Sequence, residues 1–146
     1  MKTYIGIKSV EAVPMTRGEY NEYRGWNIPA GEKPNDAGYL VRYPDGYESW
    51  SPSDVFEEAY TEKGINQLVD TCIPMKSDDY KERFRAEFQQ VKIRYDRLHN
   101  MIIKYEANAL NFSPKTPLEI LKKQASAMGQ YLYHLEVRAE IENVEL

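Results

Sequence analysis

The stretch from Ser77 to Ala109 constrains the fold more than any other part of the chain, because it predicts one long amphipathic helix. Its apolar side chains recur at spacings of three and four residues, which keeps them on one face of a helix. This stripe comprises Tyr80, Phe84, Phe88, Val91, Tyr95, Leu98, Ile102, Tyr105 and Ala109. A stripe of this length has to pack against a second apolar surface.

The C-terminal segment carries a matching surface with the same alternation. Its stripe comprises Leu118, Leu121, Ala125, Met128, Leu132, Leu135 and Ala139. The loop from Leu110 to Lys115 is short enough to turn the second helix back along the first. Thr116 and Glu119 are spaced as a capping box at the start of that second helix. We therefore predict an antiparallel helical hairpin over residues 77–146.

The first part of the chain has a different pattern, which favours strands. Residues 2–13 alternate as a strand does, and the alternation directs Ile5 and Ile7 toward the core. Residues 38–43 and 47–50 are two further strand-like runs. They are joined by Pro44-Asp45-Gly46, a strong hairpin signal.

Two short helices are predicted beside these strands. Thr16 and Glu19 form a capping box that opens a helix ending near Tyr23, and Ser51-Pro52-Ser53-Asp54 opens another. The expected fold class is α+β. A small domain of about three strands and two short helices covers residues 1–60, residues 61–76 are a linker, and the helical hairpin covers residues 77–146.

Composition narrows the classes of function. The net charge of −4 argues against a protein that coats a nucleic-acid polymer, because neutralising phosphates requires clustered Lys and Arg. The single cysteine excludes an internal disulfide, and the two histidines lack the spacing of a zinc motif, so no metal or cofactor is expected. Without a signal peptide or an apolar run near 18 residues, we expect a cytoplasmic protein with no membrane partner.

Catalytic motifs are missing as well. The sequence has no phosphate-binding loop, dinucleotide glycine fingerprint, His-Glu-x-x-His helix or Gly-x-Ser-x-Gly turn. Acid–base and nucleophilic catalysis generally require His, Cys or paired carboxylates brought together. We therefore expect a protein that is not an enzyme.

Three groups of residues are candidate ligand-binding positions. On the C-terminal helix, Tyr131, His134 and Arg138 share a face that could pack on the N-terminal domain, pack on a second copy, or surround a flat charged ligand. On the long helix, the candidates are Lys92, Tyr95 and His99, where interleaved cations and rings could hold phosphates and stack on bases, or could form a solvated face. In the N-terminal domain, the candidates are Arg17, Tyr20, Arg24, Trp26, Trp50 and Asp54, which could line a pocket or serve packing.

Several segments in both halves of the chain have a distinctive sequence, among them Met15-Thr16-Arg17-Gly18-Glu19-Tyr20, Tyr43-Pro44-Asp45-Gly46-Tyr47, Asp79-Tyr80-Lys81-Glu82-Arg83-Phe84 and Lys104-Tyr105-Glu106-Ala107. In these segments the chain resembles small tailed-phage proteins, known mainly from gut and crAss-like phages. The hairpin, especially residues 124–139, is similar to the anti-CBASS protein 2 group, whose members sequester cyclic nucleotide immune signals as oligomers. The N-terminal half, with Trp26 after a short helix and Asp54 after a strand, is faintly similar to the Thoeris anti-defence protein 2 group, which are sponges for cyclic ADP-ribose signals.

These similarities imply a phage protein that sequesters a nucleotide-derived signalling molecule of its host without altering it. The expected partner is that small molecule, and the exposed helical stripe favours a homo-oligomer. Two other hypotheses remain open at this stage. One is an adaptor that blocks a host protein through the hairpin face, and the other is an enzyme that degrades the same signals.

Overall fold

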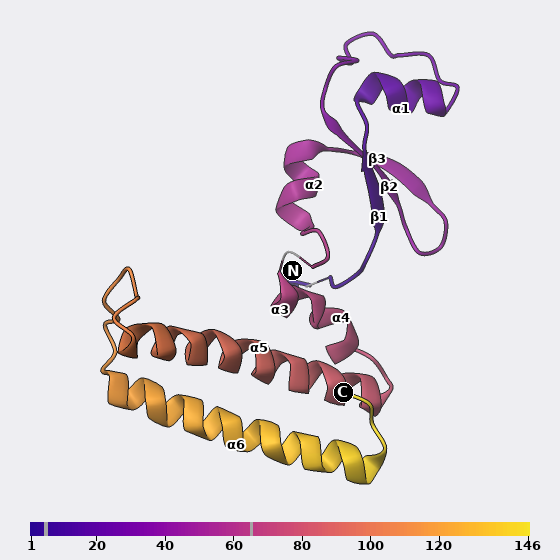
Figure 1. The fold of residues 1–146 in the computed structure, drawn as a ribbon. Coiled ribbons are helices and arrows are strands. Elements are labelled where there is room, and N and C mark those ends of the chain that lie inside the picture. Colours follow the sequence, from indigo (N-terminus) through magenta and orange to yellow (C-terminus); the bar gives the residue numbers. More distant parts are fainter. Residues whose placement is uncertain (5, 65) are drawn as a thin grey trace. The chain divides into compact units, whose positions relative to one another are not determined.

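A computed structural model describes residues 1–4, 6–64 and 66–146 of the chain (Figure 1). The chain divides into two compact units, Met1–Asn66 and Gln67–Leu146. The fold is α+β, as predicted, with strands confined to the first unit and the two long helices in the second. The prediction for Ile5 lies outside the described residues.

The first unit is built on a three-stranded antiparallel sheet in the order β1 (Glu11–Pro14), β2 (Gly38–Arg42) and β3 (Glu48–Pro52). Leu40 pairs with both Val13 and Trp50, which places these three side chains on one face of the sheet. The predicted hairpin between β2 and β3 is confirmed. Gly46 takes a left-handed φ of 85° in its turn, a conformation that glycine adopts without steric cost.

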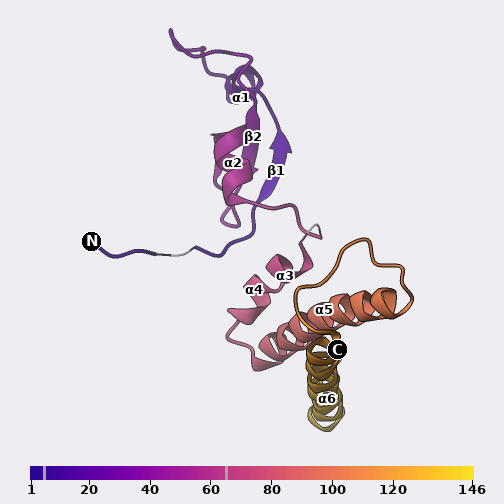
Figure 2. The same cartoon turned by 90° about the vertical axis from the view of Figure 1, so that its left-hand side faces the viewer.

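Two helices complete the first unit. Helix α1 (Arg17–Tyr23) begins at the predicted capping box, in which Thr16 and Glu19 bond each other's backbone amides. Helix α2 (Ser53–Ala59) lies along the sheet in both views (Figures 1 and 2). The Phe56 ring of α2 stacks on Tyr39 of β2 with centroids 4.3 Å apart. Tyr20, Leu40 and Val41 are buried and form the centre of this unit.

Among the described residues of the predicted strand over residues 2–13, only those from Glu11 onward are paired, and β1 then ends at Pro14, so the prediction is wrong for the other described residues. β2 ends at Arg42, which pairs with Glu11, and the hairpin closes where the Tyr43 amide bonds the Tyr47 carbonyl, so β2 does not extend alongside the described residues that precede Glu11. Ile7 is correspondingly 42% exposed rather than directed into a core.

The second unit contains the predicted hairpin. Helix α5 (Tyr80–Glu106) and helix α6 (Leu118–Glu142) run antiparallel and pack along their length (Figure 1). The buried side chains come from both predicted stripes and comprise Phe84, Ile102, Ala125, Leu132, Leu135 and Ala139. Leu135 is 1% exposed and packs in a cluster with Phe84, Ala139 and Val144.

Two short helices precede the hairpin, α3 (Gln67–Asp70) and α4 (Cys72–Met75). They occupy the segment expected as a linker and pack against α5. The buried Thr71 hydroxyl accepts a hydrogen bond of 2.8 Å from Gln90 Nε2 of α5. These short helices therefore cover part of one side of α5, around Gln90.

The helix ends differ in detail from the predictions. Asp79, rather than Ser77, caps α5 by accepting from the Lys81 amide. The capping box predicted at Thr116 is wrong, because Pro117 occupies the cap position and no side chain bonds the free amides. At its other end α6 stops at Asn143, whose left-handed φ of 50° turns the chain so that the Val144 amide bonds the Ala139 carbonyl.

Candidate functional site

A groove of about 670 Å³ runs between α5 and α6. Three lining residues come from α5, and the others come from α6 across the helix interface. The lining comprises Tyr95, His99, Ile102, Lys122, Ala125, Ser126, Gly129, Gln130, Tyr133 and His134. The volume is within the range of sites for small organic ligands.

Small residues on α6 open the groove. Ala125, Ser126 and Gly129 face α5 where larger side chains would fill the space. At Gly129 the nearest atoms to an added β-carbon are those of the Tyr95 ring, at 3.5 Å or more. The missing side chain at residue 129 therefore leaves the Tyr95 ring accessible.

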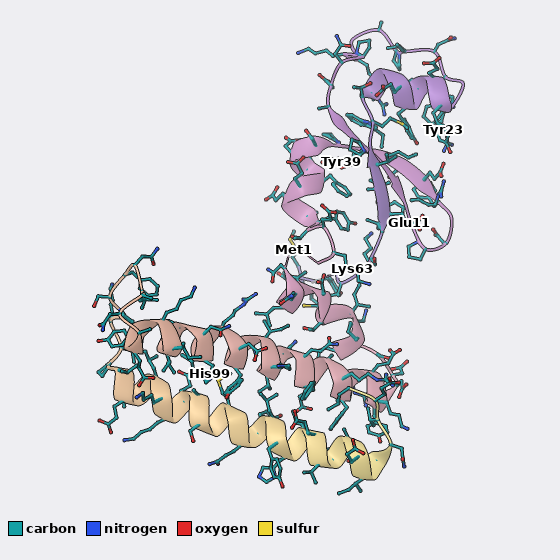
Figure 3. The ribbon with its side chains drawn as sticks, viewed as in Figure 1. Met1, Glu11, Tyr23, Tyr39, Lys63 and His99 are labelled. Atoms are coloured by element: carbon teal, nitrogen blue, oxygen red, sulfur yellow. The ribbon has the colours of Figure 1, made fainter. Side chains whose placement is uncertain are left out.

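Aromatic rings line both sides of the groove. Tyr95 and His99, one turn apart on α5, stack with centroids 5.4 Å apart and planes 9° from parallel. Figure 3 shows His99 on the side of α5 that faces α6. On α6, Tyr133 and His134 contact each other edge to face at 5.5 Å. Flat rings of this kind bind other flat rings by stacking.

The polar lining is small and mixed. Ser126 and Gln130 contribute a hydroxyl and an amide, and Lys122 is the only lysine or arginine among the lining residues that the structure describes. The Lys122 ammonium forms an ion pair with Glu106, the last residue of α5. The groove thus combines stacking surfaces, neutral hydrogen-bonding groups and one cation.

Three of the six residues predicted on the long helices line this groove, namely Tyr95, His99 and His134. The other three make contacts elsewhere. Lys92 pairs with Asp96 at 3.0 Å, and the Tyr131 hydroxyl bonds Glu87. Arg138 donates to Glu142 at 3.1 Å and lies over the Phe84 ring at 4.7 Å.

Several lining residues were not predicted as site residues, chiefly Lys122, Ser126, Gly129, Gln130 and Tyr133. A signal for them exists in the sequence. Residues 122, 126, 129 and 133 are spaced by four, three and four, which places them on one face next to the packing stripe. A glycine inside a helix lowers the stability of that helix by about 1 kcal/mol relative to alanine. Gly129 therefore also indicates a position where another part of the protein or a ligand packs close to the helix backbone.

The residues predicted in the first unit form a cluster of alternating cations and rings. The Arg17 guanidinium lies 5.1 Å from the Trp50 ring and 5.9 Å from the Tyr20 ring. Arg24 lies 5.9 Å from Tyr20 and 4.9 Å from Trp26. The structure therefore brings five of the six candidates together. Asp54 makes a different contact, accepting from the Val55 amide in the first turn of α2.

A second, smaller groove of about 460 Å³ lies at one end of this cluster. Its lining comprises Arg17, Gly31, Glu32, Lys33, Asp36 and Trp50. Arg17 donates two hydrogen bonds to Glu32, at 2.6 and 2.7 Å, and the Asn21 amide donates a third. These hydrogen bonds favour the ionised carboxylate and hold the pKa of Glu32 at about 2, well below its usual range. The bonds from Arg17 have the larger effect and the bond from Asn21 the smaller one. These contacts fasten the loop to α1, so the cationic group is already paired.

In residues 1–4, 6–64 and 66–146, no three His, Cys, Asp or Glu side chains are grouped so that they could hold a metal ion. Among the helices of this same part of the chain, none combines the length and the apolar character needed to cross a membrane.

Residues 78–141 match the family model described as Sequestin. The matched segment contains α5, the loop after it and nearly all of α6, and every residue that lines the larger groove falls within it. No curated protein matches the chain. No solved structure matches it either.

Proposed function

We propose that this chain is a phage anti-defence protein that binds a nucleotide-derived immune signal in the groove between α5 and α6 and withholds it from its effector. The observation that carries the proposal is the Sequestin match, a name that denotes sequestration, over the segment that forms the groove. The ligand class is a cyclic oligonucleotide or a cyclic ADP-ribose type molecule. Both combine flat bases with phosphates.

The lining suits such a ligand in two ways. Tyr95 and His99 offer stacked rings on which a base can lie, and base–aromatic stacking is worth about 1–3 kcal/mol per base. The Lys122 ammonium can bond a phosphate oxygen, and Ser126 and Gln130 can bond base or sugar edges. Sequestration needs these contacts alone, so the proposal includes no covalent step.

Assembly with further copies belongs to the same proposal. Outside the hairpin core, α6 leaves Ile120 and Ile141 more than half exposed, and Tyr131 is exposed between them. A second copy of the hairpin would cover this face and could complete the wall of an open groove. The protein would act in the cytoplasm of the infected cell, where such signals are made.

The direct test is a capture-and-release experiment. Purified protein is incubated with cyclic dinucleotides and cyclic ADP-ribose isomers, the free ligand is measured, and the protein is then denatured by heat. Depletion followed by release of intact ligand supports sequestration. Release of an altered ligand would point to an enzyme, and no depletion would point to an adaptor that binds a host protein.

A pair of variants tests the location of the site. Tyr95→Ala removes a lining ring, whereas Tyr105→Ala removes a ring from an exposed position of α5 outside the groove. We expect Tyr95→Ala to weaken capture about 10-fold to 100-fold, as for a lost stacking contact, and Tyr105→Ala to leave it nearly unchanged. Equal capture by both variants would place the ligand elsewhere.

The second candidate function is an adaptor that blocks a host protein through the exposed face of α6. The observation that favours it is the apolar Ile141, which is 74% exposed on the same helix as Tyr131 and Arg138. Ile141→Asp would then abolish the effect on the host without changing capture of any nucleotide. A mass measurement in solution separates this use of the face from self-assembly.

A further inference from the structure

We infer that Glu106 determines which phosphate groups the groove accepts. It favours phosphodiesters, which carry one negative charge, over terminal phosphomonoesters, which carry nearly two. This inference rests on the proposed function, because it concerns the ligand of the same groove. It assigns a specificity role to a residue that is outside the groove lining and acts through Lys122.

The position of Glu106 is electrostatically unusual. It is the last residue of α5, where the partial negative charge of the helix end disfavours a carboxylate. This unfavourable interaction is offset by the other helix, because the Glu106 carboxylate pairs with the Lys122 ammonium near the start of α6. Both side chains are about half exposed, at 49% and 50%, so the pair remains open to a ligand.

Lys122 is the only lysine or arginine in the described lining, and no aspartate or glutamate lines the groove there. The other titratable lining side chains are Tyr95, His99, Tyr133 and His134. Within the described lining, the fixed charge that an incoming phosphate meets is therefore that of Lys122, which is paired with Glu106. The two charges are opposite and close together.

This arrangement distinguishes phosphates by charge. A lysine ammonium has three donors, so a phosphodiester oxygen can bond Lys122 while Glu106 keeps its own bond. A phosphomonoester carries about −1.5 to −2 at neutral pH, and its second charge meets the Glu106 carboxylate with no second lysine or arginine in the described lining to offset the repulsion. Glu106 therefore reduces the affinity for monoesters more than for diesters.

The ion pair could instead serve only to join the two helices. A joining role would alter stability and would affect every ligand alike. A specificity role alters the ratio of two affinities, so the ratio is the quantity to measure.

The experiment compares cyclic di-adenosine monophosphate with its linear form, which carries the same bases and sugars but has a terminal 5′-phosphomonoester. Dissociation constants are measured by calorimetry at pH 8 and low salt for the wild type and Glu106→Gln. The matched control is Glu119→Gln, which removes a carboxylate paired with Lys123, one residue from Lys122 and outside the groove lining. Melting temperatures verify that all three proteins fold.

We expect the wild type to prefer the cyclic form and Glu106→Gln to reduce that preference about threefold, the size of one exposed charge interaction. Glu119→Gln should leave the preference unchanged. Because shape differences between the two ligands are the same in every protein, they cancel when the ratios are compared.

Three results would overturn the inference. If the wild type binds both forms and Glu106→Gln leaves their ratio unchanged, Glu106 has no specificity role, although the proposed function stands. The same holds if Glu119→Gln changes the ratio as much as Glu106→Gln does. If the wild type binds neither form, the groove is not a site for cyclic dinucleotides and the inference fails with it.

Discussion

Gly129 of α6 lies directly against the ring of Tyr95 of α5, and a β-carbon at residue 129 would stand 3.5 Å from Tyr95 Cε2. That distance is an ordinary van der Waals contact. The helix therefore tolerates a methyl group there, while anything larger must displace the ring or occupy the groove.

Gly129→Ala should stabilise the hairpin by up to about 1 kcal/mol, because glycine is the poorer residue inside a helix. Urea unfolding followed by circular dichroism measures the change. A loss of stability would mean that the contact with Tyr95 is tighter than an ordinary packing distance.

Gly129→Leu should abolish ligand capture, because its side chain would occupy the space between the two helices that the groove provides. The helix signal in circular dichroism should remain. Ala127→Leu, an exposed position on α6 outside the groove lining, is the matched control and should capture ligand normally. Full capture by Gly129→Leu would contradict the assignment of the groove.

Leu135→Ala should destabilise the hairpin by about 2–5 kcal/mol, because it leaves a cavity beside Phe84 in a core that excludes water. The measurement is the free energy of unfolding from urea titration. Ile103→Ala removes a similar side chain from an exposed position of α5, outside the face proposed for assembly, and should change the free energy by less than about 0.5 kcal/mol.

Gly38→Ala should destabilise the first unit by about 1–3 kcal/mol through overpacking. A β-carbon at residue 38 would lie 2.4 Å from both the Ser51 carbonyl oxygen and Trp50 Cζ2. Both tryptophans of the chain are in the first unit, so tryptophan fluorescence reports its unfolding. Gly6→Ala, where an added β-carbon would meet nothing within 4 Å, should be neutral.

The Arg17–Glu32 pair predicts a pH dependence of the first unit. The pKa of Glu32 is about 2 in the folded protein and therefore lower than in the unfolded chain. Since the folded state favours the ionised carboxylate, the pair stabilises the unit at neutral pH, and this contribution is lost as the pH falls from about 4.3 toward 2.

Glu32→Gln should therefore lower the melting temperature at pH 7 and make it less dependent on pH in that acidic range. Fluorescence-detected melting between pH 2 and 7 measures both effects. Glu22→Gln, at an exposed position of α1, is the control and should retain the wild-type slope. An unchanged slope in Glu32→Gln would show that other groups cause the acid sensitivity.

The sequence by itself determined the elements whose patterns are local. Apolar spacings of three and four predict α5 and α6, because each stripe is a property of one helix, and Pro44-Asp45-Gly46 predicts the β2–β3 hairpin for the same reason. The strand predicted at residues 2–13 failed over its described residues before Glu11, because a strand needs a partner and the alternation of its own residues does not say how far β2 extends.

Only the tertiary structure decided which side chains form the groove. Tyr95, His99 and His134 were recognisable as rings on helices, but whether a given ring borders a space depends on the residue opposite it on the other helix. Gly129 stands opposite Tyr95 because of how the two stripes interlock, whereas Tyr131 is turned toward Glu87. The pairing of Lys122 with Glu106 follows from the same interlocking, since no local pattern relates residues on separate helices.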